Sequence, residues 1–109
     1  MSTPVPSRLE VAERLRAVID PEVGLNIVDL GLIYDLQVSP DGTVEVKLTM
    51  TTPACPMSSY LKQEVARVLQ RTPGIRRGII ELVWNPPWSP YMIDPDVRRY
   101  RFPMYARPY

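Results

Sequence analysis

Apolar residues follow a helical spacing near the start of the chain. Val11, Leu15 and Val18 recur at helical intervals, which predicts an amphipathic helix over residues 8–19. Ser7 begins a Ser-x-x-Glu sequence of the capping-box type, so it is the expected N-cap of this helix.

The Asp20-Pro21 pair is expected to end the helix, because a residue before proline disfavours the helical conformation. Residues 20–24 then have the composition of a turn, and they carry two carboxylates, Asp20 and Glu22. Such carboxylates are more often solvated turn residues than ligands. Both interpretations stay open at this point.

An alternation of apolar and polar residues follows. Even-numbered positions are apolar from Val28 to Val38 and from Val44 to Met50, which predicts a long strand over residues 27–38, a turn, and a second strand. Each strand has one apolar, buried face made by its even-numbered residues, and these residues must lie on the same face of the sheet. The numbers of paired residues must therefore sum to an even value, 80 or 82. Either register puts the acidic turn at the end of the sheet where the second strand stops. A β-bulge would shift this count.

A second helix and a third strand complete the pattern. An apolar stripe through Leu61, Val65 and Leu69 predicts a helix that packs on the hairpin and ends at Pro73-Gly74. About sixteen helical residues span roughly 24 Å, so the chain returns to the hairpin-turn end and the next strand, residues 79–84, must run back. This strand delivers the Asn-Pro-Pro-Trp sequence after it to the same end as the acidic turn.

These elements predict an α+β fold. It is a two-layer α-β-β-α-β domain with a small three-stranded mixed sheet covered on one face by helices. Residues 1–92 form the domain and residues 93–109 a C-terminal extension, in which Asp94-Pro95 begins a short helix through Arg101 and an irregular tail follows. We interpret the Arg- and aromatic-rich tail as a cover over an apolar edge of the core, with a docking segment as the alternative.

Cys55 stands between the second predicted strand and the second helix. Because Pro56 suits the first helical position, Cys55 is the expected N-cap, where the helix dipole and free N–H groups favour the thiolate. A buried, inert cysteine is the competing interpretation. The register and the helix length bring six residues to one end of the sheet: Asp20, Glu22, Thr51, Thr52, Cys55 and Trp88.

Composition narrows the classes of function. The chain has 109 residues, 45% of them hydrophobic, which is typical of one globular domain. Its net charge of +1 does not indicate nucleic-acid binding. It has no histidine, which excludes Cys/His zinc sites and most acid–base catalysis by histidine. A single cysteine forms no intramolecular disulfide, and no signal-type apolar run opens the sequence, so a cytoplasmic protein with no membrane partner is expected.

Three separated motifs carry a family resemblance. The stretches DPEVGLNIVDLGLIYDLQV, TMTTPACP and LVWNPPWSPYMI closely resemble the small domain family of iron–sulfur cluster assembly and targeting proteins, which includes SufT, the PaaD proteins of the phenylacetate pathway and the eukaryotic cytosolic targeting adaptor. The resemblance runs from about Asp20 to Met92 and implies the same two-layer fold. The family's signature positions fall on Asp20, Glu22, Asp29, Gly31, Thr52, Cys55, Pro56, Pro87 and Trp88.

The resemblance implies an accessory role in iron–sulfur cluster assembly or in cluster delivery to client apoproteins, and no enzymatic activity. Cys55 would be the metal ligand, and the cofactor-binding residues would be Cys55, Thr51, Thr52, Asp20 and Glu22. Clusters usually take four thiolates and even a homodimer offers two, so a transient cluster or iron is expected and no stable cofactor.

Two alternatives stay open. PaaD-type members carry a further cysteine-bearing segment that is absent here, so a SufT-like role is favoured over PaaD-like service to a ring-oxygenase system. A thiol-dependent enzyme, with Cys55 as nucleophile and Glu22 or Asp20 as base, ranks below both, because carboxylates near a thiol raise its pKa.

Overall fold

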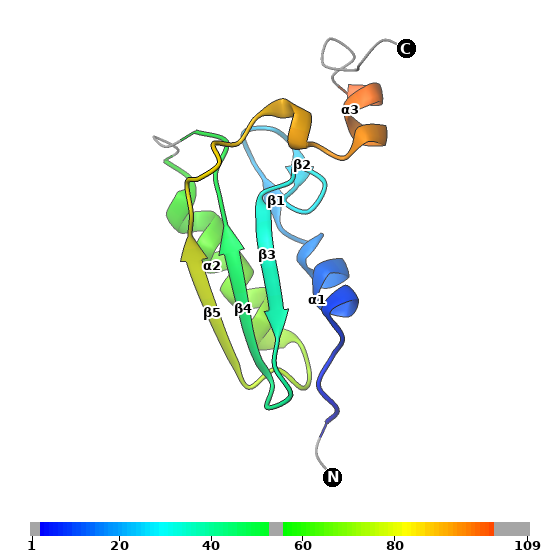
Figure 1. The fold of residues 1–109 in the computed structure, drawn as a ribbon, viewed down its shortest axis with the longest axis vertical. Coiled ribbons are helices and arrows are strands. Elements are labelled where there is room, and N and C mark those ends of the chain that lie inside the picture. The colour runs from blue at the N-terminus through cyan, green and yellow to red at the C-terminus, as the bar shows by residue number, and fades with distance from the viewer. Residues whose placement is uncertain (1–2, 53–55, 102–109) are drawn as a thin grey trace.

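The computed structural model of the chain describes residues 3–52 and 56–101. The helices are α1 (Arg8–Leu15), α2 (Ser58–Arg71), the short 3-10 helix η1 (Pro90–Met92) and α3 (Pro95–Arg101). The strands are β1 (Ile19–Asp20), β2 (Leu25–Asn26), β3 (Ile33–Val38), β4 (Thr43–Leu48) and β5 (Arg77–Leu82). A three-stranded sheet forms one layer, α1 and α2 form the other, and α3 lies beyond the end of the sheet (Figure 1). The predicted α+β fold with a mixed sheet is confirmed.

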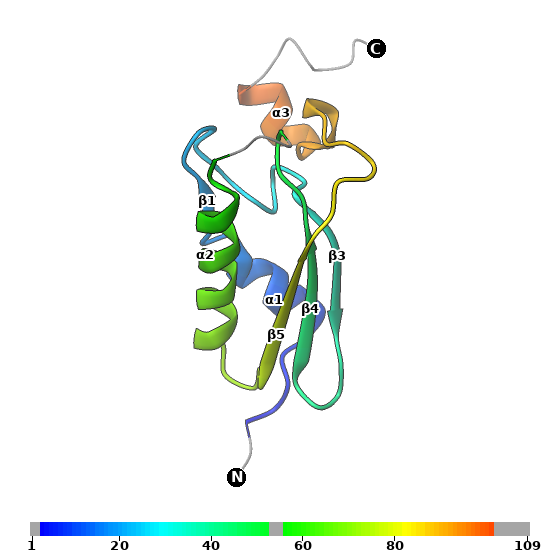
Figure 2. The same cartoon turned by 90° about the vertical axis from the view of Figure 1, so that its left-hand side faces the viewer.

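The sheet has the order β3-β4-β5, with β3 antiparallel and β5 parallel to β4. Leu36 pairs with Val46 and Val38 with Val44, so the paired numbers sum to 82, one of the two predicted registers. A bulge between Ile33 and Asp35 shifts the register at the start of β3. Beyond the bulge, the even-numbered residues of the three strands therefore share one face of the sheet, and the core forms between the sheet and α2, which Figure 2 shows as two layers.

The core is built from the periodic residues of the predicted elements. Leu61, Val65 and Leu69 of α2 are buried in the same hydrophobic cluster as Val44 and Val46 of β4. Burying one such aliphatic side chain contributes about 1.5–3 kcal/mol, so the stripe on α2 fixes its orientation on the sheet.

The first helix is shorter than predicted. It begins after Ser7, whose hydroxyl oxygen accepts a hydrogen bond from the N–H of Glu10 at 3.1 Å, as expected for the N-cap. It ends at Leu15 rather than residue 19, because three successive i→i−3 hydrogen bonds tighten the chain, the last from the Val18 N–H to the Leu15 carbonyl.

The prediction of a single strand over residues 27–38 is wrong in its first half. Residues 27–32, which follow the small hairpin β1–β2 of residues 19–26, form turns instead. In these turns the Leu30 N–H donates to Asn26 O and the Leu32 N–H donates to Ile27 O. Gly31 adopts a φ of +74°, which no strand residue has. The turns bury Leu30 and Leu32, as a strand would, so the alternation of apolar residues did not distinguish the two structures. They also bury Ile27, an odd-numbered residue that a strand would place on the other face.

The third strand and the last helix follow the predicted order. β5 lies two residues earlier than the expected range 79–84, and α3 matches the predicted helix from Asp94-Pro95 through Arg101. Ile93, only 2% exposed, belongs to the hydrophobic core, and the Asp94 N–H donates to Asp29 O at 2.7 Å. The tail beyond Arg101 lies outside the described residues.

Candidate functional site

Four segments meet at one end of the molecule. The C-terminal end of β4, the N-terminal end of α2, the β1–β2 turn and the chain after β5 all lie at the end opposite the β3–β4 turn (Figures 1 and 2). The chain after β5 reaches this end because β5 runs parallel to β4, so both strands end there. The predicted convergence of the loops is therefore present among the described residues.

Asp20 is the buried carboxylate at this end. It is 1% exposed, and its Oδ1 accepts a hydrogen bond from the Glu22 N–H at 2.8 Å. Its own carbonyl oxygen accepts from the Gly24 N–H at 2.7 Å, which closes the β1–β2 turn. The Glu22 side chain is exposed. The turn thus holds the Asp20 carboxylate in place and leaves the Glu22 side chain exposed.

Thr51 and Thr52 follow directly from the end of β4. The preceding Thr49 is buried, and its N–H donates to Leu32 O at 2.8 Å, which ties the end of the strand to the turn before β3. The hydroxyl of Thr49 has no hydrogen-bond partner among the described residues. Thr51 is half-buried and Thr52 is exposed, so both hydroxyls come at the point where the chain leaves the sheet.

Cys55 lies outside the described residues, and the helix after it begins later than predicted. α2 starts at Ser58, and Met57 is its N-cap with no side-chain cap hydrogen bond. Pro56 is therefore not at the first helical position, and Cys55 is not the N-cap. Across residues 3–52 and 56–101, no group of three or more His, Cys, Asp or Glu residues is arranged to hold a metal ion.

The segment after β5 is fastened across this end by three polar contacts. The Trp88 indole Nε1 donates to Leu30 O at 2.7 Å, and the Tyr34 hydroxyl contacts both Pro86 O, at 2.7 Å, and Met92 Sδ, at 3.3 Å. Gly31 packs closely against the backbone of Met92, because a Cβ at Gly31 would be 2.3 Å from Met92 O. Gly31 and Trp88, two of the signature positions, therefore brace the loops.

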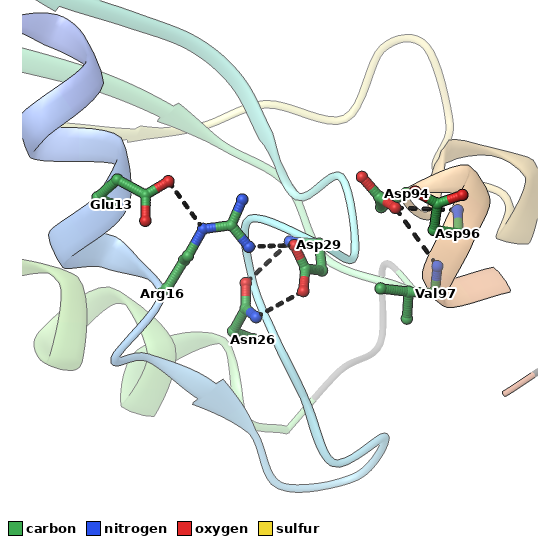
Figure 3. A network of polar contacts seen from close by, with 7 residues as sticks. All are labelled: Glu13, Arg16, Asn26, Asp29, Asp94, Asp96 and Val97. Carbon is green, nitrogen blue, oxygen red and sulfur yellow. Dashed lines mark hydrogen bonds and ion pairs between the residues drawn. The ribbon is translucent and has the colours of Figure 1, made fainter. Parts of the chain in front are cut away.

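Asp29 is the centre of a polar network between α1, β2 and the turn after it (Figure 3). Its carboxylate accepts hydrogen bonds from Arg16 and, at 2.9 Å, from Asn26 Nδ2, while its own N–H donates to Asn26 Oδ1 at 2.9 Å. The hydrogen bond to Asp29 raises the pKa of the Arg16 guanidinium, and a further one to Glu13 acts in the same direction. Asp29 is thus bound within the protein and is not placed to receive a ligand.

The predicted site residues fall into two groups. The β1–β2 turn places Asp20 and Glu22 together, and Thr51 and Thr52 share their end of the molecule. Trp88 faces the Leu30 carbonyl and acts as a brace. Sequence reasoning missed Arg16, Asn26 and Tyr34, which hold these loops; only the Asn-x-x-Asp spacing of residues 26–29 signals a local side-chain-to-backbone turn.

Comparison with known proteins identifies the domain. The family model described as "Iron-sulfur cluster assembly protein" matches residues 8–82. The Fe-S protein maturation auxiliary factor SufT of Staphylococcus aureus is 41% identical over 77 residues, which cover 71% of this chain and 88% of that protein. The auxiliary factor YitW of Bacillus subtilis is 39% identical over 75 residues, which cover 69% of this chain and 74% of that protein.

The same domain also occurs within longer proteins. An iron-sulfur cluster carrier protein of Synechocystis is 32% identical over 80 residues, which cover 73% of this chain and 22% of the carrier.

Of the helices among the described residues, none has both the length and the hydrophobicity that crossing a bilayer requires.

A solved structure supports the fold over most of the chain. The crystal structure of a domain of unknown function DUF59 from Bacillus anthracis superposes with a TM-score of 0.81 at 34% identity, covering 85% of this chain and 89% of that one. A match of the family model over more than half of the chain and a relative above 40% identity agree with it. The chain therefore belongs to the iron–sulfur cluster assembly protein family.

Proposed function

We propose that the protein is an accessory factor in iron–sulfur cluster assembly that takes up iron or a cluster transiently through Cys55 and passes it to client apoproteins. The observation that carries this proposal is the position of the Asp20–Glu22 turn at the same end of a domain of this family as the end of β4, which leads into Thr51 and Thr52 and, in sequence, to Cys55. The bound iron or cluster is cargo and not a resident cofactor.

The donor set accounts for transient binding. The chain has one cysteine and no histidine, whereas stable clusters are usually held by four thiolates. A thiolate combined with the Glu22 carboxylate mixes a soft and a hard ligand and gives a labile site. A homodimer that joins two such sites would supply two thiolates and would still leave the cluster easy to release.

We also propose that the protein is not an enzyme and works in the cytoplasm. The proposed role needs only a ligand-exchange surface, and the names of the similar proteins describe auxiliary factors and carriers. The similarity to SufT, which covers 88% of that protein, favours SufT-like service over a PaaD-like role. The assembly machinery and client apoproteins are the expected partners.

Anaerobic reconstitution with iron and sulfide tests the site. The wild-type protein is expected to give a substoichiometric chromophore that a chelator removes quickly. Cys55→Ala should abolish it and Glu22→Ala should reduce it, while Glu45→Gln, which changes an exposed carboxylate of β4, should leave it unchanged. A stable, fully occupied cluster retained in the Cys55→Ala protein would refute the assignment.

Maturation of an iron–sulfur enzyme tests the role. In a strain that depends on this protein, Cys55→Ser should lose the maturation activity while the purified variant keeps the far-UV circular dichroism and the melting temperature of the wild type. Full maturation by the Cys55→Ser variant would show that the thiol is not needed and would leave only an adaptor role.

A further inference from the structure

An open apolar groove lies between α1 and β3, the strand at one edge of the sheet (Figure 1). Its volume is about 370 Å³, and its apolar lining comes from Leu9, Ala12, Val28, Ile33 and Leu36. We refer to this surface as the α1–β3 groove. Contiguous apolar surface on a soluble protein usually marks a contact site.

Leu9 projects from this surface into solvent. It is 78% exposed, more than any other large aliphatic side chain of residues 3–52 and 56–101. Its neighbours Ala12 and Leu36 in the lining of the groove belong to or pack against the hydrophobic core. The α1–β3 groove therefore combines a projecting aliphatic side chain with a concave apolar surface beside it.

Two side chains of opposite charge also line the groove, Arg8 at the start of α1 and Asp35 in β3. The Asp35 carboxylate accepts hydrogen bonds from the Gln37 amide at 3.2 and 3.3 Å. Within the described residues, neither Arg8 nor Asp35 takes part in an ion pair. The groove thus offers one cation and one anion to a binding partner.

We propose that the α1–β3 groove binds the same groove of a second copy of this chain, in a homodimer with two-fold symmetry. In such an interface residue i of one copy contacts residue j of the other and the reverse, so one surface must carry both members of every complementary pair. The α1–β3 groove meets this requirement twice. Leu9 of each copy enters the concave apolar surface of the other, and Arg8 of each copy faces Asp35 of the other.

The charges favour a second copy over other occupants. A partner with one dominant charge would bring a like charge to Arg8 or to Asp35, which is repulsive. An uncharged apolar partner would remove water from both charged groups without pairing them, which is costly. A second copy supplies an anion for Arg8 and a cation for Asp35 at the same time.

Charge reversal tests this interface in a Cys55→Ser background, which has no thiol and so keeps the result independent of the proposed function. In sedimentation velocity, the Cys55→Ser protein should be a dimer that dissociates on dilution. Arg8→Glu brings two anions together at each contact and Asp35→Arg brings two cations together, so each variant alone should dimerise at least about tenfold more weakly.

Mixing the two variants gives the decisive measurement. In a mixed dimer the reversed charge of one chain lies opposite the reversed charge of the other, and the two unchanged charges also face each other. Native mass spectrometry should therefore show a heterodimer at a concentration at which each variant alone is monomeric. An ion pair within one chain could not produce this result.

Two further variants complete the design. Leu9→Ser should also weaken the dimer, and it should leave the fold intact because Leu9 is exposed, so it still decides if a charge-reversed variant fails to fold. The matched control is Lys62→Glu, which reverses an exposed cation on α2 and should leave the dimer unchanged. A Cys55→Ser protein that is monomeric at its highest soluble concentration overturns the proposal. So does a dimer that tolerates Leu9→Ser, or a mixture of folded charge-reversed variants that forms no heterodimer.

Discussion

The indole Nε1 of Trp88 donates a hydrogen bond of 2.7 Å to the carbonyl oxygen of Leu30, a residue 58 positions earlier in the chain. Leu30 is fully buried, so no water can replace this donor. This one contact joins the segment after β5 to the turn before β3, and it fixes the loops at the end of the molecule that carries the proposed site.

Removing the indole donor should destabilise the protein measurably. Trp88→Phe keeps most of the apolar ring but leaves Leu30 O unpaired, which should lower the free energy of unfolding by about 1–3 kcal/mol. Urea denaturation followed by circular dichroism measures the change. The matched control is Trp84→Phe, at an exposed tryptophan, which should stay within about 0.5 kcal/mol of wild type. Equal losses in both variants would mean that the hydrogen bond contributes nothing specific.

Adding a methyl group at Gly31 should be costly. Its φ is +74°, and the new Cβ would lie 2.3 Å from Met92 O, a backbone atom that cannot move away alone. Gly31→Ala is expected to cost roughly 2–4 kcal/mol of unfolding free energy. Gly78→Ala is the control, because there the nearest atom is the flexible end of Leu69, at 2.8 Å. A Gly31→Ala protein with wild-type stability would show that the segment through Met92 is not held against this turn.

The Asp29 network should matter more than its outer ion pair. Asp29→Asn removes the charge that holds Arg16 and should cost about 1 kcal/mol, a modest value because Arg16 is partly exposed. Glu13→Gln removes only the exposed pair with Arg16 and should change the stability by less than about 0.5 kcal/mol. Thermal denaturation at low and high salt measures both. If Glu13→Gln is the more damaging change, the network is centred on α1 and not on Asp29.

The β3–β4 turn should show a pH dependence of its own. The Ser39 hydroxyl, followed by the Thr43 N–H, lowers the pKa of Asp41 below its ordinary value. A lowered pKa gives stabilisation that is present above the ordinary aspartate range and is lost as the pH falls through the folded-state value. A carboxyl NMR titration should therefore give a lower midpoint in wild type than in Ser39→Ala. An unchanged midpoint in Ser39→Ala would remove the hydroxyl as the cause.

The periodic elements could be predicted from sequence, and the irregular ones could not. Leu61, Val65 and Leu69 fixed α2, and the parity of the apolar residues fixed the register of β3 with β4, because one face of each element is buried along its length. Residues 27–32 failed because a compact turn can bury the same positions as a strand. The positive φ of Gly31 is visible only in the structure, and the Asn-x-x-Asp spacing of residues 26–29 is the feature of the sequence that indicates this turn.

The meeting of the loops at one end of the molecule was predictable from the sequence. Parallel pairing of β5 and the two-layer packing follow from helix length and strand direction, which is why the loops were expected at one end. The bracing partners were not predictable, since Tyr34 and Pro86 are 52 residues apart and nothing in their local sequence pairs them. The N-cap at Met57 also differs from prediction, so the argument for an acidic Cys55 thiol from a helix terminus no longer applies.

The parallel pairing of β4 with β5 has a consequence for the order of folding. Thr43 pairs with Arg77 and Leu48 with Leu82, so partners are 34 residues apart, whereas Val38 and Val44 of the hairpin are close in sequence. Closing the longer loop costs more conformational entropy, and this cost arises before the strand contacts that compensate for it have formed. The β3–β4 hairpin should therefore form early and β5 should dock late. The Trp88 hydrogen bond to Leu30 lies after β5 in the chain. During synthesis, the end of the molecule that carries the proposed site therefore forms last, after residues 77–88 have been made and have docked.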